Sequence, residues 1–404
     1  MNTELLKSKL LEAAFNGSLT HADTSTWEST NIANIADVKG GKRIPAGTSV
    51  QKEPTSHVYL RVTDMKNFTI VDDDIRYITD DLFEGIKKYT ISEDDLYLTI
   101  AGTIGRVGSI PHKYSGMSLT ENAVKLTNIK IDKSYLMYYL ASYGVQRRIS
   151  LFVHQLAQPK LSIENIRSIH IQYPSLEEQR KLVATLEEGF TYIDAVASAK
   201  HNLSISANLL RSKILEDAFK GLLTSADVNK WEIAELGTAC KHQNGDRGKN
   251  YPSKKKLSHC GIPFISALNL VNNTVIDDDK LLKMSEEQFN KLGNGKLQQR
   301  DFVLCIRGSV GKHGIYPFEK GAIASSLVIL RPVPDKLSLM WLSYYFDSSL
   351  FRENLLEYIN GTAQPNLAAK ELMKFRIPLP PLAEQQRIVA KIEELFTQID
   401  KITK

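Results

Sequence analysis

The chain contains an internal repeat, and this repeat limits its fold more than any other feature. Residues 4–20 (ELLKSKLLEAAFNGSLT) match residues 208–224 (NLLRSKILEDAFKGLLT) with eleven identities in seventeen positions. Solenoid repeats recur every ~20–50 residues, so an offset of 204 residues indicates two diverged copies of a whole domain. Three further blocks recur in the same order at an offset of 206: residues 95–108 with 301–314, 157–161 with 363–367, and 176–194 with 382–400.

The repeat is divided at an unusual place. In the middle of the chain, the block at residues 176–194 runs on through residues 195–208 into the LLRSKILEDAF block. In the other copy, the matching blocks close and open the chain. If the C-terminus lies beside the N-terminus, the divided pieces rebuild the same element. The order of the blocks therefore predicts a closed arrangement with approximate two-fold symmetry.

A long amphipathic helix is predicted from about residue 177 to about residue 223. Leu182, Leu186 and Phe190 follow the helical period, and Glu, Lys and Gln fill the other faces. A helix with a single apolar stripe needs a partner, and the simplest partner is its own repeat. We therefore expect an antiparallel, coiled-coil-like helix pair as a spacer, with residues 204–206 as a place where the long helix could bend.

Between the helical segments, short β-rich runs alternate with Gly, Asn and Asp clusters, and helical patches interrupt them. The predicted fold class is α+β, with two homologous globular domains separated by long antiparallel helices in a pseudo-two-fold arrangement. The expected boundaries are an N-terminal helix at 1–22, a first domain at 27–175, a helical spacer at 176–226, a second domain at 231–380 and a C-terminal helix at 381–404.

The composition is that of a soluble globular protein, with 404 residues of which 42% are hydrophobic and 24% are charged. No apolar run approaches the ~18–20 residues that cross a bilayer, and the polar N-terminus does not match a secretion signal, so we expect a cytoplasmic protein. The three cysteines lack CxxC spacing, which argues against a zinc site or disulfides. The net charge of +5 is only a weak indication of nucleic-acid binding.

Two glycine-rich runs occupy matching places, at residues 102–108 and 308–314, each after a predicted strand and each with a basic residue. Glycines let a backbone approach a phosphate or a base closely, and the cation supplies charge. The alternative is a tight hairpin that needs positive φ, and recurrence in both copies does not decide between the two. The candidate DNA contacts here are Thr103, Gly105, Arg106, Arg307, Ser309 and Lys312.

A second pair of motifs follows, at residues 158–160 (QPK) and 364–366 (QPN). Gln158, Gln364 and Asn366 carry amides that can pair with adenine, and Lys160 can reach guanine or a phosphate. A rigid proline turn before the next element is the alternative.

A third pair consists of basic loops that follow Gly41 and Gly245. The candidates are Lys42 and Arg43 in the first copy, and Arg247 and Lys249 in the second. Solvated charged loops are the plain interpretation, but like charge at matching places favours a surface that faces phosphates.

Catalytic and metal-binding patterns are missing from the sequence. No Walker loop, dinucleotide fingerprint, HExxH motif or methyltransferase tetrapeptide occurs, and the acids at residues 72–74 and 277–279 lack the rest of a calcium loop. We interpret these acids as turn residues and expect no bound metal. The residues thus indicate a binding protein: either a DNA-recognition subunit or a non-catalytic scaffold whose twin domains bind protein or carbohydrate.

The blocks resemble those of the specificity subunits of type I restriction–modification systems. The resemblance covers the whole chain and rests on LLRSKILEDAFKGLLT followed by a tryptophan, on AQPNL, and on PLPPLAEQQRIVAKIEELF. It implies two variable target-recognition domains, each reading one half of a split DNA target, with the helices setting the gap between the halves. The chain departs from an exact repeat in one respect. The linker between the two helical blocks is shorter where they meet across the chain ends than where they are continuous in the middle of the chain.

The resemblance also implies partners. Two modification (methyltransferase) subunits would dock on the helices, and restriction (translocase and nuclease) subunits would join them on double-stranded DNA. S-adenosylmethionine, ATP and magnesium would belong to these partners, with no cofactor in this chain. The candidate docking residues are Leu182, Leu186, Phe190, Ile193, Leu210, Ile214, Ile388, Ile392 and Phe396.

Overall fold

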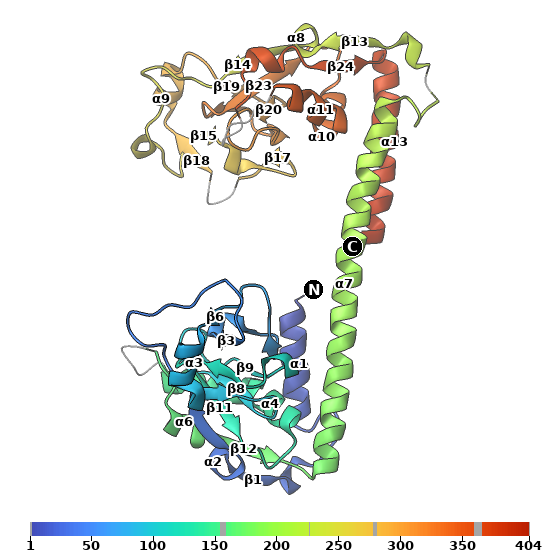
Figure 1. The fold of residues 1–404 in the computed structure, drawn as a ribbon. Coiled ribbons are helices and arrows are strands. Elements are labelled where there is room, and N and C mark those ends of the chain that lie inside the picture. Colours follow the sequence, from blue (N-terminus) through green and yellow to red (C-terminus); the bar gives the residue numbers. More distant parts are fainter. Residues whose placement is uncertain (1, 154–158, 226, 278–280, 359–365, 404) are drawn as a thin grey trace. The chain divides into compact units, whose positions relative to one another are not determined.

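The computed structural model describes residues 2–153, 159–225, 227–277, 281–358 and 366–403. The chain divides into two compact units, Met1–Ala199 and Lys200–Lys404, and each is described by itself (Figure 1). The long helix α7 (Leu176–Phe219) contributes its first half to unit 1 and its second half to unit 2. It remains helical through residues 204–206, where the sequence suggested a bend.

In its described residues, unit 1 combines helices with four small sheets, whose strand orders are β1-β12, β6-β3-β10-β7, β2-β11-β8-β9 and β4-β5. Besides α7, its elements are α1 (Thr3–Phe15), β1 (Glu28–Asn31), α2 (Ile32–Ile35), β2 (Asp37–Gly40), β3 (His57–Leu60), β4 (Met65–Lys66), β5 (Thr69–Ile70), β6 (Tyr77–Ile78), α3 (Asp80–Ile86), β7 (Thr90–Ile91), β8 (Leu96–Thr99), β9 (Val107–Ser109), β10 (Met117–Leu119), β11 (Ala123–Thr127), α4 (Lys133–Ala141), α5 (Tyr143–Val153), α6 (Ile163–Arg167) and β12 (His170–Tyr173).

The part of unit 2 that the structure describes has three sheets, with strand orders β13-β24, β18-β15-β22-β19 and β14-β23-β20-β21-β17-β16. Its elements after α7 are β13 (Glu232–Glu235), α8 (Leu236–Ala239), β14 (Cys240–Asn244), β15 (Ile262–Ile265), β16 (Leu270–Val271), β17 (Asn273–Val275), β18 (Leu282–Met284), α9 (Glu286–Lys291), β19 (Lys296–Gln298), β20 (Phe302–Cys305), β21 (His313–Ile315), β22 (Lys320–Ile323), β23 (Leu327–Pro332), α10 (Leu339–Asp347), α11 (Ser349–Tyr358), α12 (Ala369–Leu372), β24 (Arg376–Leu379) and α13 (Leu382–Thr403).

The two units share one strand topology, as the repeat predicts. The sheet β2-β11-β8-β9 matches β14-β23-β20-β21, and β6-β3-β10-β7 matches β18-β15-β22-β19. One parallel pair also corresponds, since β3 pairs with β10 as β15 pairs with β22. The predicted α+β class is therefore confirmed, and each helical patch proves to be two helices, α4 with α5 and α10 with α11. The finer domain boundaries within each unit stay a prediction.

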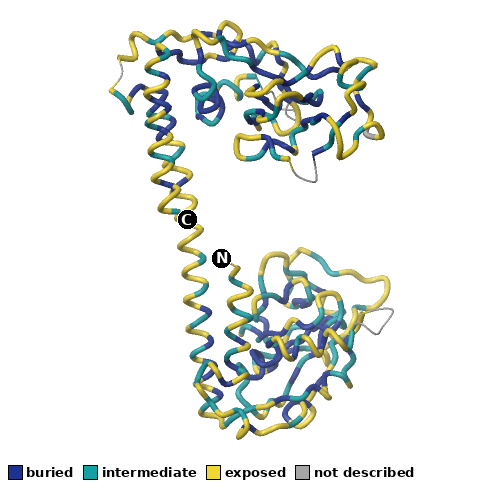
Figure 2. Tube along the Cα trace, turned by 180° about the vertical axis from the view of Figure 1, so that it is seen from behind, coloured by how far each residue is buried: buried dark blue, intermediate teal, exposed yellow. Residues whose placement is uncertain are grey.

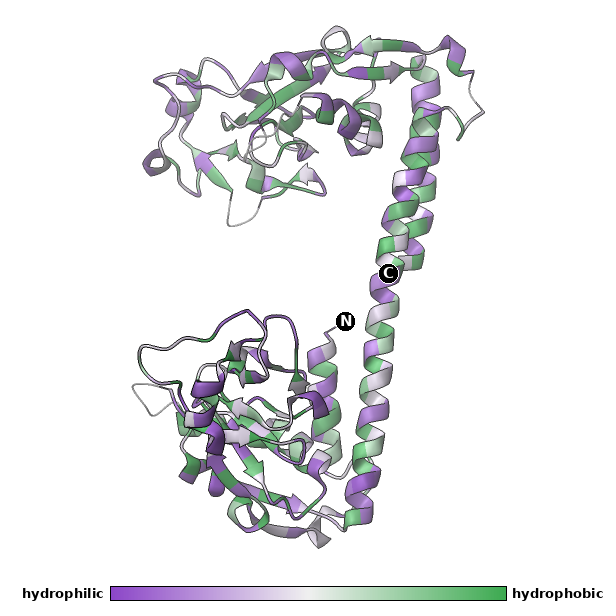
Figure 3. Cartoon of the chain, in the orientation of Figure 1, coloured by the Kyte–Doolittle hydropathy of each residue, from purple (hydrophilic) through white to green (hydrophobic). Residues whose placement is uncertain are grey.

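Each unit contains an antiparallel helix pair. In unit 1, Lys7 of α1 contacts Asp194 of α7, while Leu10, one turn later in α1, lies against Gly189, earlier in α7. In unit 2, the second half of α7 pairs in the same sense with α13. Apolar residues alternate with polar ones along these helices (Figure 3).

An aromatic residue of α1 in unit 1 and one at the end of α7 in unit 2 make equivalent contacts. Phe15 of α1 packs edge-on against Tyr135, with ring centroids 5.4 Å apart. At the equivalent place in unit 2, Phe219 of α7 packs against Trp341, with centroids 4.3 Å apart. These aromatic contacts join each helix pair to the core of its own unit. Figure 2 shows buried residues in both units. The α1 fragment thus takes in unit 1 the place that the end of α7 takes in unit 2.

The predicted docking stripe needs correction. Leu182, Leu186, Phe190, Ile214, Ile388 and Ile392 are buried in the cores of their own units. Ile193 and Phe396 pack partly buried against those cores, and of the nine candidates only Leu210 is exposed, at 50%. The helices bury most of this apolar stripe against each other and against the adjoining domain, so Leu210 alone of the nine offers an exposed side chain to a partner.

A buried glutamine fixes the start of each long helix. Gln179 accepts a hydrogen bond from the Asp132 N–H at 2.9 Å and donates one to the Pro174 carbonyl at 2.8 Å. Gln385 repeats this arrangement with the Ser338 N–H at 2.8 Å and the Pro380 carbonyl at 2.9 Å. These glutamines belong to the EEQ and AEQ segments of the repeat, and they tie α7 and α13 to the caps of α4 and α10.

Among the described residues, no helix is both long enough and apolar enough to cross a membrane.

Candidate nucleic-acid interface

The two glycine runs form tight turns between β8 and β9 and between β20 and β21. Gly102 and Gly308 have φ values of 75° and 77°, while Gly105 and Gly311 have values of 92° and 91°. This backbone region favours glycine, so both runs form tight hairpins that need positive φ, and the DNA contacts of these loops stay a prediction. A Cβ atom on Gly105 would lie 2.5 Å from Oε1 of Gln146, whereas Gly308 has open space around it. One glycine of each pair therefore faces a helix, and the other lies in the exposed loop.

The cation of each glycine run is exposed but directed back to the main chain. Arg106 donates to the carbonyl of Met65 at 3.3 Å, and Lys312 donates to the carbonyl of Ala267 at 2.8 Å. Thr103 and Ser309 are exposed at the tips of the same loops. The cations therefore brace the hairpins against the preceding segments.

The second pair of motifs lies directly beside the glycine runs. The Leu161 N–H donates to the Ile100 carbonyl at 2.9 Å, and the Leu367 N–H donates to the Ile306 carbonyl at the same distance. Lys160 and Asn366 precede these leucines and are exposed. The expected contacts Gln158 and Gln364 lie outside the described residues. In both units, main-chain bonds thus bring two predicted motifs together.

The third motif in unit 1 approaches the same region. A Cβ atom on Gly41 would lie 2.1 Å from the Thr120 carbonyl oxygen, so only glycine allows this close approach. Lys42 is exposed, but Arg43 donates to Glu121 at 2.7 Å. Burial raises the pKa of Glu121, but its hydrogen bonds, with Arg43 first among them, outweigh this and hold the pKa below its usual value. The charge of Arg43 is therefore largely balanced within the unit.

The corresponding loop in unit 2 has a different charge balance. Gly245 makes the same close approach, here to the Ala324 carbonyl. Arg247 donates to the Ser325 carbonyl at 3.4 Å, and it forms no ion pair with any described residue. Lys249 is exposed nearby. This loop therefore presents a guanidinium whose charge is not balanced by a carboxylate.

The unit 2 motifs meet around a pocket of about 270 Å³. Arg247 and Arg307 line it from two predicted motifs. The main chain of Arg307 pairs with that of Asn366 in an isolated antiparallel β-bridge. We call it the cationic pocket; its lining residues are His242, Asn244, Arg247, Ile306, Arg307, Leu367, Ala368, Ala369 and Lys370.

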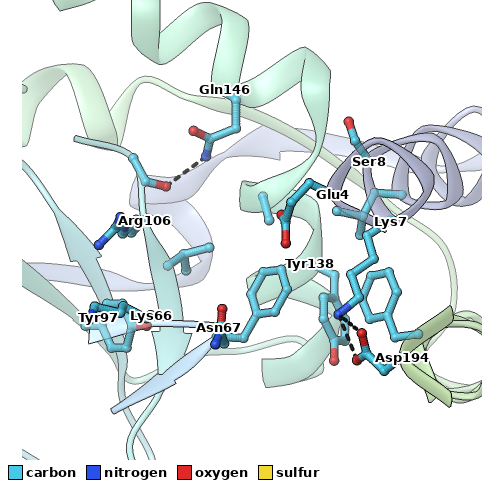
Figure 4. Close-up of a pocket in the computed structure, with 16 residues that line it drawn as sticks. Glu4, Lys7, Ser8, Lys66, Asn67, Tyr97, Arg106, Tyr138, Gln146 and Asp194 are labelled. Atoms are coloured by element: carbon cyan, nitrogen blue, oxygen red, sulfur yellow. Dashed lines mark hydrogen bonds and ion pairs between the residues drawn. The ribbon is translucent and has the colours of Figure 1, made fainter. Parts of the chain in front are cut away.

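Arg106 and Lys312 lie apart from the other candidates. Arg106 lines a larger hollow of about 920 Å³ in unit 1, between the hairpins and the helix pair (Figure 4). Charges of both signs line this hollow, including the Lys7–Asp194 ion pair. Lys312 lines a smaller hollow of about 330 Å³ at the equivalent place in unit 2. Each glycine run thus has two sides, and its cation, Arg106 or Lys312, faces the side of the helices.

Sequence reasoning missed three polar residues of the cationic pocket: His242, Asn244 and Lys370. They lie outside the matched blocks, on β14 and α12. The signal that could have found them is difference between the copies, because their counterparts in the first copy have other chemical character.

A family model described as the type I restriction modification DNA specificity domain matches residues 24–202 and again residues 228–404. The chain belongs to this family and contains two copies of its domain. It is accordingly a specificity subunit of a type I restriction–modification system with two target-recognition domains.

Individual relatives agree with this assignment. A Methanocaldococcus jannaschii protein assigned as the MjaX type I restriction enzyme specificity subunit is 24% identical over 93% of this chain and 88% of its own length. A chain from a solved structure of a type I restriction–modification system superposes with a TM-score of 0.72 at 19% identity, covering 93% of this chain and 92% of that one. The HsdS subunit from Thermoanaerobacter tengcongensis gives a TM-score of 0.57 at 19% identity, covering 93% and 90%. The two structures show that the fold is shared.

Proposed function

We propose that the chain recognises a bipartite DNA target, with each unit contacting one half. The observation that carries this proposal is the repeated loop surface: in both units the same main-chain bonds hold the same loops, while the exposed side chains differ. Main-chain bonds give each unit a fixed frame, and different side chains let the two units read different bases. The two half-sites are therefore expected to differ in sequence.

The helices would set the gap between the half-sites and dock the partners. Two modification subunits are the expected partners, with restriction subunits joining them; adenine methylation and ATP-dependent cleavage, with S-adenosylmethionine, ATP and magnesium, would belong to these subunits. The chain itself would be non-catalytic. Because most of the predicted docking stripe is buried, we assign docking to exposed apolar residues of α7, namely Tyr192 and Val196 in unit 1 and Leu203 and Leu210 in unit 2.

The test is to express the full chain with its modification subunits in cells that lack other adenine methylation, and to map methylated adenines. The expected result is one bipartite motif with a fixed gap. Exchanging residues 27–175 for those of a relative with a different target should change one half of the motif only. A continuous motif, or a change in both halves, would contradict the proposal.

Direct binding separates DNA recognition from a scaffold that binds protein or carbohydrate. Contacts with several phosphates release counterions, so DNA affinity should fall steeply between about 50 and 200 mM salt. Fluorescence anisotropy of a labelled duplex with the full chain measures this dependence. Absence of duplex binding at low salt, both alone and with the modification subunits, would favour the scaffold.

A further inference from the structure

The cationic pocket concentrates positive charge on one side of unit 2. Arg247 reaches it from the loop after β14, Arg307 from the glycine run and Lys370 from α12. All three side chains are exposed, and none of the described residues that line the pocket is an acid. Three cations that converge without a carboxylate carry unbalanced charge, which favours an anionic ligand.

Asp246 and Glu371 each stand next to a pocket cation in the sequence, and neither lines the pocket. The carboxylate of Glu371 is paired with a lysine outside the pocket, at 2.9 Å. Asp246 is buried, and its carboxylate accepts hydrogen bonds from the N–H groups of Gly248 at 2.7 Å and Gly293 at 2.8 Å. These bonds, with that of Gly248 first, hold the pKa of Asp246 below its usual value despite burial. Its charge is committed to the main chain of the loop, so Arg247 stays available to a ligand.

Unit 1 lacks these charges at the corresponding positions. Ala101 stands where unit 2 has Arg307, and Glu164 stands where unit 2 has Lys370. Arg43 corresponds to Arg247, but Glu121 pairs with it at 2.7 Å. The main-chain bonds around these positions are the same in both units. The difference therefore lies in the side chains and leaves the frame unchanged.

We propose that the cationic pocket binds a phosphate group of the DNA backbone, and that unit 2 thereby supplies an electrostatic anchor that unit 1 lacks. This inference rests on the proposed DNA recognition. A phosphate is favoured over a base edge because three cations of different geometry meet at one small pocket. Base readout uses a single bidentate side chain for each base. A guanidinium group can also donate two hydrogen bonds at once to the oxygens of one phosphate.

The test measures the salt dependence of binding to a labelled, mixed-sequence 40-base-pair duplex, using the full chain from about 50 to 200 mM NaCl. Each lost phosphate contact lowers the slope of log affinity against log salt by about 0.9, which is a factor of about 3.5 over this range. Because the pocket holds one phosphate, the Arg307→Ala, Lys370→Ala double variant should lower the slope by about 0.9, and each single variant should lower it by less. The loss should be the same on duplexes of unrelated sequence.

Two matched variants control for charge and position. Lys230→Ala removes one exposed, ion-paired cation of unit 2, and Lys181→Ala removes one of unit 1. Both lie outside the predicted DNA-contact motifs and outside the residues that line the pockets. Both should leave the slope close to that of the unaltered chain. Circular dichroism melting checks that every variant folds.

Three results would overturn the inference. If the unaltered chain binds and the Arg307→Ala, Lys370→Ala double variant keeps its slope, the pocket contacts no phosphate. If Arg307→Ala weakens binding to some sequences only, at an unchanged slope, Arg307 reads a base. If the unaltered chain binds no duplex, either alone or with its modification subunits, the proposed function fails first, and the inference fails with it.

Discussion

The ammonium of Lys7 lies 2.8 Å from the carboxylate of Asp194, which joins α1 to the first half of α7 within unit 1. Arg211 and Asp400 form the same ion pair in unit 2, between the second half of α7 and α13. Lys7 and Arg211 occupy equivalent positions in the repeat, as do Asp194 and Asp400. The cation of this pair therefore lies on the separate helix α1 in unit 1 and on the continuous helix α7 in unit 2.

This ion pair should contribute less to stability than the apolar contact beneath it. Lys7 also lies over the Phe190 ring, 5.6 Å from its centroid, and Phe190 is buried. Exposed ion pairs contribute at most about 1 kcal/mol, whereas truncating a buried phenylalanine costs about 3–5 kcal/mol. Lys7→Ala should accordingly destabilise unit 1 far less than Phe190→Ala. Urea unfolding followed by the fluorescence of Trp27, the one tryptophan in unit 1, measures both.

A double-variant cycle with Asp194→Ala isolates the ion pair itself. A loss for Lys7→Ala equal to that for Phe190→Ala would contradict the ranking.

The buried glutamine of α13 should be needed for the stability of unit 2. Gln385→Ala leaves the Ser338 N–H and two carbonyls without partners, and a buried polar group without a hydrogen bond costs about 1–3 kcal/mol. The neighbouring Gln386→Ala, at an exposed position, should cost much less. Unfolding followed by Trp231 and Trp341 fluorescence in a Trp27→Phe background compares the two. Equal losses would mean that the hydrogen bonds of Gln385 do not matter.

The two glycines of one hairpin should differ in their tolerance of alanine. Gly102 and Gly105 both have positive φ, so either substitution strains the backbone by about 1–2 kcal/mol. Only at Gly105 does the added Cβ atom meet Gln146, whose amide donates to the Gly105 carbonyl at 2.9 Å. Gly105→Ala should therefore lower the unfolding midpoint of unit 1 more than Gly102→Ala, measured by Trp27 fluorescence. Equal effects would show that Gln146 moves aside without cost.

A buried carboxyl gives unit 2 a specific dependence on pH. Burial raises the pKa of Asp347 above its usual value of 3.8, although His313, 3.5 Å away, partly opposes this. A group whose pKa is higher in the folded chain stabilises it fully below the unfolded pKa, and this contribution is lost as the pH rises through the folded value. Asp347→Asn should remove this loss, so its stability relative to the unaltered chain should improve as the pH rises above 3.8.

Urea unfolding at a series of pH values, in the same Trp27→Phe background, measures this difference. A difference between Asp347→Asn and the unaltered chain that does not change with pH would contradict the assignment.

Patterns that depend on the main chain were predictable from the sequence. The repeat predicted the shared topology, and the matched motifs predicted loops that the Leu161 and Leu367 main-chain bonds bring together. The side on which a loop residue lies was not predictable, and Arg106 and Lys312 proved to face the helices.

Two further features could not be predicted from sequence periodicity alone. An apolar stripe is the same whether it packs within its own chain or against a partner, so Leu182 and Ile388 were assigned to the wrong surface. The polar residues of the cationic pocket come from segments that diverge between the copies. Their grouping depends on the pairing of β14 and β23 and on the place of α12 beside the glycine run.

The main-chain frame around the loops has a consequence for how such a chain can change. Ala101 and Arg307 occupy equivalent positions beside the same main-chain hydrogen bonds, and so do Glu164 and Lys370. Within a single molecule, one backbone arrangement therefore already accepts neutral, acidic and basic side chains at these two positions. A mutation there alters what the loop meets without disturbing what holds it. New binding preferences can therefore arise by single substitutions, one domain at a time, while the other domain keeps its own.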